Sequence, residues 1–350
     1  MQFSHESIVG VEHAASNCVR LACNAMATRF EIVLYGENPV ALRAAGEEAI
    51  EEIRRLEAIL SLYRPSSEIA HVNGRAAREA VRVSPRVFAL LEHAQRLTTE
   101  TSGAFDATIA PLVRCWGFMG GAGKIPAANE LADARAKVGM HLVQLNRQDF
   151  TVRFAVEGVM LDLGAIGKGY AVDCASEILA EAGITRGLLH SGTSTVSAIG
   201  TPPSEDGWKI AIDHPANRPD PAVLATDAVL MAESGAKSKP LTIIHLKDES
   251  LSVSAVWGKS FEADRRTLGH VLDPRTGKPV TDAVLAAVVL PSATETDALS
   301  TALLTLGPDA HETFAKLRPG MRTLLVSQTG GNYCFRSNGV EIDPSSGISI

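Results

Sequence analysis

Aromatic residues are scarce in this chain, and charge of one sign never gathers in a run. Phe, Trp and Tyr together make up 5% of the 350 residues, and the net charge is −7. The sequence holds no Lys/Arg cluster of the kind that neutralises nucleic-acid phosphates, which argues against a nucleic-acid partner. An anionic ligand therefore needs a local site built for it.

Cysteines and long apolar runs are also few. The five cysteines show no Cys-x-x-Cys pairing and are odd in number, which favours reduced thiols over a disulfide framework. The longest apolar run, 283–290, is far shorter than the roughly 20 residues that cross a bilayer. Residues 1–19 lack the basic and apolar regions of a secretory signal, and no convincing lipobox follows them. These absences predict a cytoplasmic protein without a transmembrane segment.

What remains is the composition of a folded globular protein, with 45% apolar and 21% charged residues. Apolar residues follow helical spacing in 42–60, 85–99 and 127–138. Strand-like patterns occur in 30–34, 141–145, 151–155, 208–213, 241–247 and 252–256. Because helices and strands do not alternate regularly, we expect an α+β fold with mixed helices and antiparallel-rich sheets. We expect an irregular arm over 1–20 and one interlocked catalytic domain over 21–350.

The most informative segment is Asp162-Leu163-Gly164-Ala165-Ile166-Gly167-Lys168-Gly169, which predicts a strand, a glycine turn and the start of a helix. Glycines let a ligand approach the backbone, and the helix N-terminus and Lys168 favour an anion such as a diphosphate. A plain tight turn with a solvent-facing lysine remains the alternative. A Walker A loop is excluded, because the glycine spacing is wrong and a glycine follows Lys168.

A second segment, 292–301, predicts a helix with a possible capping box between Ser292 and Glu295. Asp297 and Thr301 then lie one turn apart on one face, where a carboxylate and a hydroxyl offer hard oxygen ligands to Mg²⁺. Spacing alone favours a purely structural role, because Asp and Thr in the first turns of a capped helix usually need no metal.

Three further residues combine ligand-binding chemistry with loop-like surroundings. His270 precedes an Asp-Pro-x-x-Gly turn and suits an acid or base, a ligand contact or a structural role. Tyr63 is able to stack on a ring system, and Asp106 to accept hydrogen bonds from one. Burial in the core or helix capping explains these two nearly as well.

The order of the segments resembles that of the ApbE family of FAD:protein FMN transferases. Six matches follow one another between about Cys23 and Gly307: Met26-Ala27-Thr28, the Tyr63-to-Asn73 stretch, Gly-Ala-Phe-Asp-x-Thr, Asp-Leu-Gly-x-x-x-Lys-Gly, His-x-x-Asp-Pro-x-x-Gly and Asp-x-x-x-Thr.

The resemblance implies a set of site residues. The Mg²⁺ ligands are the side chains of Asp297 and Thr301 and the carbonyl of Ala165, with Ser300 a weaker candidate. The FAD-contacting positions are Met26, Tyr63, Ala104, Phe105, Asp106, Asp162 and Lys168, with Val271 nearby. His270 and Lys168 are the residues implicated in the reaction.

The resemblance also implies an activity. With Mg²⁺, FAD is split, FMN is joined through its phosphate to a Ser or Thr hydroxyl of an acceptor protein such as a redox-complex subunit, and AMP leaves. The chain departs from the family pattern at Ala27, at Gly192-Thr193 and at Val253-Ser254-Ala255. An Mg²⁺-dependent FAD pyrophosphatase that releases FMN, or a noncatalytic flavin-binding protein, therefore remains an alternative.

Overall fold

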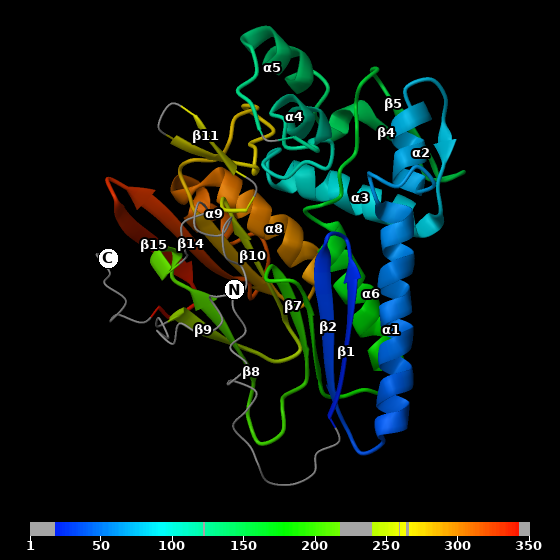
Figure 1. The fold of residues 1–350 in the computed structure, drawn as a ribbon, viewed down its shortest axis with the longest axis vertical. Helices are drawn as coiled ribbons and strands as arrows, with labels where there is room; N and C mark the ends of the chain where they lie inside the picture. Colours follow the sequence, from blue (N-terminus) through cyan, green and yellow to red (C-terminus); the bar gives the residue numbers. More distant parts are fainter. Residues whose placement is uncertain (1–17, 122, 218–239, 259, 264–265, 343–350) are drawn as a thin grey trace.

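The computed structural model describes residues 18–121, 123–217, 240–258, 260–263 and 266–342. An eight-stranded sheet forms its centre (Figure 1), with neighbouring strands antiparallel throughout. The strands in spatial order are β1 (Cys18–Ala25), β2 (Thr28–Tyr35), β6 (Gly187–Ser191), β7 (Thr195–Ile199), β10 (Ser250–Ala255), β13 (Leu285–Leu290), β14 (Arg322–Thr329) and β15 (Asn332–Asn338). Together with the helices, this sheet confirms the predicted α+β class.

Strand β13 shows why the sheet is covered on both faces. All six of its residues are buried, as an apolar run without polar alternation requires. Successive side chains point to opposite faces, so Leu285, Ala287 and Val289 join one apolar cluster and the residues between them join another. The first cluster lies against β8 (Trp208–Asp213) and β9 (Pro240–Leu246), and the second lies under the helices.

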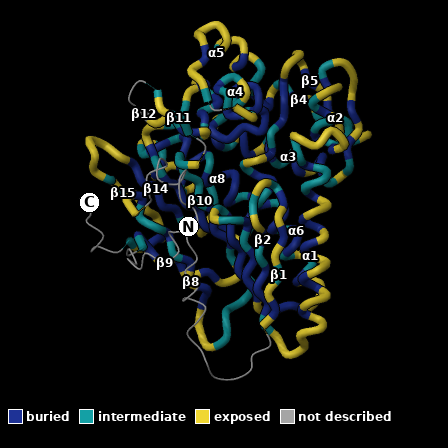
Figure 2. The backbone as a smooth tube through the Cα atoms, viewed as in Figure 1, coloured by how far each residue is buried: buried dark blue, intermediate teal, exposed yellow. Residues whose placement is uncertain are grey.

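Helices α1 (Pro39–Leu60), α6 (Gly167–Glu181) and α8 (Ala293–Leu306) pack in sequence on the other face (Figure 1). The long helix α1 begins where Asn38 accepts hydrogen bonds from two backbone N–H groups and Pro39 fixes the first turn. Its inner face is buried and its outer face is exposed (Figure 2). Helices α6 and α8 are apolar on most sides, because each lies between other elements.

The remaining helices and strands lie outside the central sheet and the three helices that cover it. They are α2 (Glu68–Arg75), α3 (Pro85–Glu100), α4 (Ala110–Cys115), α5 (Ala128–Arg135), α9 (His311–Phe314), a small sheet of β3 (Val81–Arg82), β5 (Thr151–Phe154) and β4 (Val143–Asn146), and the hairpin of β11 (Ser260–Ala263) and β12 (Arg266–Gly269). The β4–β5 hairpin confirms the one expected around 146–149. In the described residues, no helix combines the length and the apolar character needed to cross a membrane.

Three expectations about local structure were wrong. Strand β1 begins at Cys18, within the irregular arm expected over 1–20; residues 1–17 lie outside the described residues. Part of the loop expected after Tyr63 is helix α2, and the third helix ends at Arg135.

The strand expected before Gly164 is also missing, because a side chain replaces a neighbouring strand. The amide of Asn73 donates to the Leu161 carbonyl at 2.9 Å and accepts from the Leu161 N–H at 2.7 Å. The next N–H, that of Asp162, donates to the Ala107 carbonyl at 2.7 Å. The segment is extended and hydrogen-bonded without belonging to a ladder.

Strain is visible in the turn that joins β1 to β2. Met26 and Ala27 both have positive φ, 51° and 58°, as in the two-residue hairpin turns that match strand twist. Residues with a Cβ adopt this conformation at a cost of about 1 kcal/mol each. Ala27 therefore carries a penalty that a glycine at this position would avoid.

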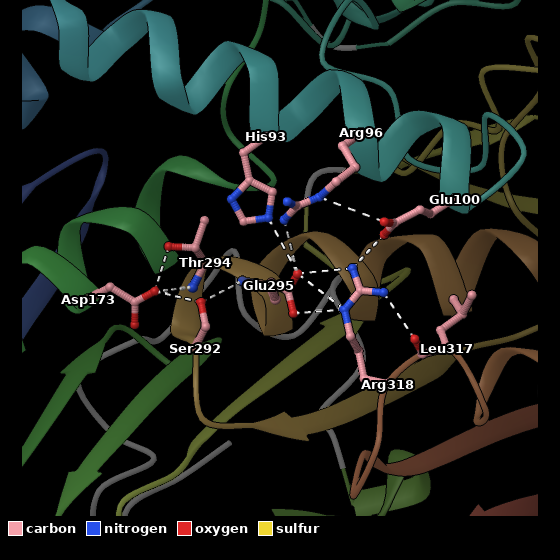
Figure 3. Close-up of polar contacts among 9 residues, drawn as sticks. All are labelled: His93, Arg96, Glu100, Asp173, Ser292, Thr294, Glu295, Leu317 and Arg318. Carbon is pink, nitrogen blue, oxygen red and sulfur yellow. Dashed lines mark hydrogen bonds and ion pairs between the residues drawn. The ribbon is translucent and has the colours of Figure 1, made fainter.

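An ionic network fastens α3 to the start of α8 (Figure 3). The Glu295 carboxylate lies 3.0 Å from Arg318, 3.4 Å from His93 and 3.6 Å from Arg96. Arg318 also contacts Glu100 at the end of α3. The contacts with His93 and Arg318 lower the pKa of Glu295 to about 2, even though its partial burial acts in the opposite direction.

This pKa predicts how acid weakens the fold. Because the folded-state pKa lies below the unfolded value, the carboxylate stabilises the fold above about pH 4.5, and this contribution is lost as pH falls through 2. We expect Glu295→Gln to lower the free energy of unfolding by about 2–3 kcal/mol at pH 7 and by much less at pH 2–3, measured by urea titration.

A matched control lies on α3. Glu92 pairs with Arg147 through two contacts, but the Arg147 side chain is 79% exposed. Glu92→Gln should cost no more than about 1 kcal/mol, as exposed pairs do. Equal losses in the two variants would show that the Glu295 network is no stronger than a surface ion pair.

Candidate active site

The glycine turn before α6 brings Lys168 to a buried carboxylate on α8. Lys168 Nζ donates to the Gly164 carbonyl at 2.6 Å and lies 3.4 Å from both carboxylate oxygens of Asp297. The Gly169 N–H donates to Asp297 Oδ2 at 3.0 Å. Asp297 is 4% exposed, so its charge is balanced by these groups and not by water.

Gly169 permits this approach because it has no side chain. A Cβ at this position would lie 2.1 Å from the Ala293 carbonyl oxygen and 2.8 Å from Asp297 Cβ. The first turns of α6 and α8 therefore touch backbone to backbone. The glycine after Lys168, which excluded a Walker A loop, is required by packing against α8.

The contact between the two helices is reciprocal. Asp173 on α6 accepts hydrogen bonds from the N–H groups of Ala293 and Thr294 and from the hydroxyls of Ser292 and Thr294, at 2.6–2.9 Å (Figure 3). It thus caps α8, while Asp297 on α8 binds the start of α6. The expected capping box is half correct: Ser292 accepts from the Glu295 N–H at 3.2 Å, but the Glu295 carboxylate turns to the arginines.

The residues expected to bind a metal belong to the two segments that meet at this junction. Thr301 lies one turn after Asp297 and donates its hydroxyl to the Asp297 carbonyl at 3.3 Å, while Ala165 is in the turn that ends at α6. Ser300 is fully buried and Thr301 is not, which favours Thr301 as the ligand. One carboxylate, one hydroxyl and one carbonyl suit a hard cation such as Mg²⁺. Over the residues described, no group of three His, Cys, Asp or Glu side chains suggests a softer metal.

Asp162 and Tyr63 adjoin the same turn. The Gly164 N–H donates to Asp162 Oδ1 at 2.8 Å. Burial raises the pKa of Asp162, and the Gly164 N–H and the nearby Lys168 partly oppose the increase. Tyr63 is 68% exposed, yet desolvation of its hydroxyl and the charge of Asp162 raise its pKa. An exposed ring beside a buried carboxylate and a lysine is suited to bind a ligand with both a ring and phosphates.

Met26 is linked to this region by Glu57, near the end of α1. Its backbone N–H donates to Glu57 Oε1 at 2.8 Å, and Glu57 Oε2 pairs with Arg64, the neighbour of Tyr63, at 2.5 Å. A cavity of about 500 Å³ opens here, lined by Asn24, Ala25, Ala27, Thr28, Arg29, Glu57 and Arg64. The contact with Glu57 was not expected from the sequence.

Asp106 makes hydrogen bonds within the protein, whereas the resemblance implies a contact with FAD. It accepts from the N–H and hydroxyl of Thr108 and from the Met140 N–H at 2.5–3.0 Å, and its burial raises its pKa. Ala104 and Phe105 are 1% and 2% exposed. Asp106 nevertheless lines a second cavity of about 470 Å³, next to Ser102, Gly103, His141, Pro274 and Arg275.

His270 and Val271 follow β12 directly, as expected for a strand end. His270 is exposed, and a Cβ on Gly258 would lie 3.2 Å from its Cε1, so the ring lies against that glycine. Val271 accepts from the Val280 N–H at 2.9 Å and packs against the main core. The Asp-Pro-x-x-Gly turn forms as expected, with the Gly277 N–H donating to the Asp273 carbonyl at 2.7 Å.

The structure thus brings Tyr63, Asp162, Lys168, Asp297 and Thr301 into one cluster and places Met26 beside it. Asp106 and His270 lie on neighbouring segments, and their roles toward a ligand stay predictions. Sequence reasoning assigned no role to Asp173. The signal was its spacing from Gly169, four residues earlier on α6, which places the acid on the helix face that packs against α8.

Solved structures with the same fold include proteins named as flavin transferases. The apo crystal structure of the flavinyl transferase ApbE from Pseudomonas stutzeri is 26% identical, with a TM-score of 0.78 over 94% of this chain and 97% of that one. The ApbE protein of Thermotoga maritima is also 26% identical, with a TM-score of 0.77 over 90% and 96%. The fold of this chain is therefore that of the ApbE flavin transferases.

The sequence comparisons agree. Residues 26–325 match the model of the ApbE family, and the chain belongs to that family. A protein of Klebsiella pneumoniae named FAD:protein FMN transferase is 26% identical over 326 residues, 91% of this chain and 87% of that protein. One of Escherichia coli with the same name is 27% identical over 281 residues, 79% and 74%. The resemblance inferred from the six ordered motifs is confirmed.

Proposed function

We propose that this chain is an Mg²⁺-dependent FAD:protein FMN transferase. The observation that carries the proposal is the junction of α6 and α8, where Lys168 and the buried Asp297 adjoin hydroxyl and carbonyl oxygens. The names of the relatives in Klebsiella pneumoniae and Escherichia coli supply the reaction. In that reaction the acceptor hydroxyl oxygen forms a bond to the FMN phosphorus, the diphosphate bond to AMP breaks, and the hydroxyl proton passes to a base.

Each residue has a task that follows from its position. Asp297, Thr301 and the Ala165 carbonyl would hold Mg²⁺, which supplies charge stabilisation at the diphosphate when bound. Lys168 adds a fixed positive charge at the N-terminus of α6, where an anion is already favoured. Tyr63 offers its exposed ring to the flavin or adenine, and His270 is the candidate base for the acceptor proton.

The first alternative differs from the proposal only in what receives FMN. With water in place of the acceptor hydroxyl, the same site would act as a pyrophosphatase. Thr193 lies just before β7 and Ala255 ends β10, and these two departures are the reason to keep a noncatalytic flavin-binding role in the test. The acceptor is proposed to be a protein with an exposed Ser or Thr, such as a subunit of a redox complex.

We expect the purified protein to release AMP from FAD with Mg²⁺ and to transfer FMN to protein. The assay adds FAD to desalted proteins of the organism that encodes the chain, and detects covalent flavin by fluorescence in a denaturing gel and by mass spectrometry. Excess chelator should abolish both products. AMP with free FMN and no labelled protein would identify a pyrophosphatase, and bound FAD without AMP would identify a noncatalytic protein.

A further inference from the structure

One strand of the central sheet presents a row of hydroxyl groups to α8. Its members occupy alternate positions of β10 and therefore share one face: Ser250, Ser252 and Ser254, here called the serine row. Strand and helix run with matched spacing, because two strand residues advance about 6.7 Å and four helix residues about 6 Å. Each serine of the row can therefore meet a successive turn of the segment 291–301.

The contacts follow this spacing. Ser250 donates to the Pro291 carbonyl at 3.2 Å, and the Ser252 and Thr296 hydroxyls lie 2.8 Å apart. Ser254 Oγ lies 2.8 Å from Ser300 Oγ and 3.1 Å from Thr301 Oγ1. The last member of the row thus touches a residue assigned to the metal site, while the two others do not.

In each of these hydroxyl pairs either oxygen is able to donate, and one arrangement gives every proton an acceptor. Ser300 and Thr301 each have one proton, and both donate it to the Asp297 carbonyl, at 3.1 and 3.3 Å. Their oxygens are then acceptors toward Ser254, whose own proton is shared between them. Thr301 keeps its remaining lone pair for another partner.

We infer that Ser254 is a positioning residue for the metal ligand Thr301. Its hydroxyl holds the Thr301 side chain in the rotamer that directs the proton to Asp297 and the free lone pair away from β10. The inference rests on the proposed function, because that proposal assigns Thr301 to the metal. Partners that orient a ligand in this way are typically worth 10–100-fold in metal affinity.

The serine row contains its own control. Ser252 makes the same kind of hydroxyl pair with Thr296, is 1% exposed and also contacts Thr195 at 3.0 Å, yet touches no proposed ligand. Ser252→Ala and Ser254→Ala therefore remove equivalent links between β10 and α8. A purely structural role predicts that the two variants behave alike.

The test measures binding of Mn²⁺ alone by electron paramagnetic resonance, without FAD and therefore without turnover. We expect Ser254→Ala to weaken Mn²⁺ binding about tenfold, Ser252→Ala to change it less than twofold, and Ser254→Thr, which keeps the hydroxyl, to stay within threefold of the unsubstituted protein. In AMP-release assays, Ser254→Ala should raise the Mg²⁺ concentration for half-maximal rate while saturating Mg²⁺ restores most of kcat.

The two proposals fail in different ways. Equal Mn²⁺ affinities in the two alanine variants, or no Mn²⁺ binding by the unsubstituted protein, would overturn the role of Ser254. A tenfold loss confined to Ser254→Ala in a protein that releases no AMP from FAD would support that role and reject the transferase. Thermal unfolding of each variant shows whether a loss of binding reflects a loss of fold.

Discussion

Asp297→Asn should reduce the release of AMP from FAD by at least about 10²-fold, because the proposed metal site loses its only carboxylate. Asparagine retains an oxygen that accepts from the Gly169 N–H. The variant also loses the charge that faces Lys168 at 3.4 Å. Because the hydrogen bond from Gly169 is kept and only the ion pair with Lys168 is lost, we expect a decrease of about 1 kcal/mol in the free energy of unfolding. Chromatographic assay of AMP and urea titration measure the two effects.

Asp173→Asn is the matched control on the partner helix. Asp173 accepts four hydrogen bonds at the start of α8 and belongs to no proposed ligand set. Its replacement should cost about 1–2 kcal/mol of stability and leave AMP release within severalfold at temperatures where the variant is folded. A reversal, with Asp173→Asn inactive and Asp297→Asn active, would show that capping, and not metal binding, is what the site requires.

Lys168→Met should slow FAD cleavage by about 10²-fold or more, the usual cost of one lost preorganised electrostatic contact. The substitution keeps most of the apolar stem and removes the ammonium that lies between the Gly164 carbonyl and Asp297. Riboflavin has the flavin ring without phosphate, so its binding should hardly change. The measurements are AMP release and fluorescence titration with both flavins.

A lysine away from the cluster separates a local effect from a change in net charge. Lys278 is exposed in the turn after His270, and Lys278→Met should leave cleavage within twofold. If riboflavin and FAD binding fell together in Lys168→Met, the lysine would support the shape of the site, and another cation would have to face the diphosphate.

Periodicity in the sequence was enough to predict the elements on which the site is built. Helical spacing placed Asp297 and Thr301 on one face, and the glycine turn placed Lys168 at the start of a helix, as the structure shows. These features are local, because they depend on residues within a few positions of one another. That the two helices form one site was inferred from the resemblance in motif order, and not from the spacing of residues.

The features that were missed depend on contacts between residues far apart in the chain. The amide of Asn73 takes the place of a strand beside Leu161, and Glu57 binds the Met26 turn. Arg318 draws Glu295 away from the capping box that its spacing predicts. In each case one side chain satisfies a distant backbone or charged group, and no local pattern records that pairing.

The exchange of carboxylates between α6 and α8 has a consequence for the energetics of ligand binding. Each helix supplies a carboxylate that accepts hydrogen bonds from N–H groups at the start of the other helix. The turn carrying Lys168 is therefore held in place before any substrate arrives. Little conformational entropy is then left for FAD to remove at that turn, and binding free energy is available to orient the diphosphate. The ordering cost has been met during folding, by the same two side chains that join the helices.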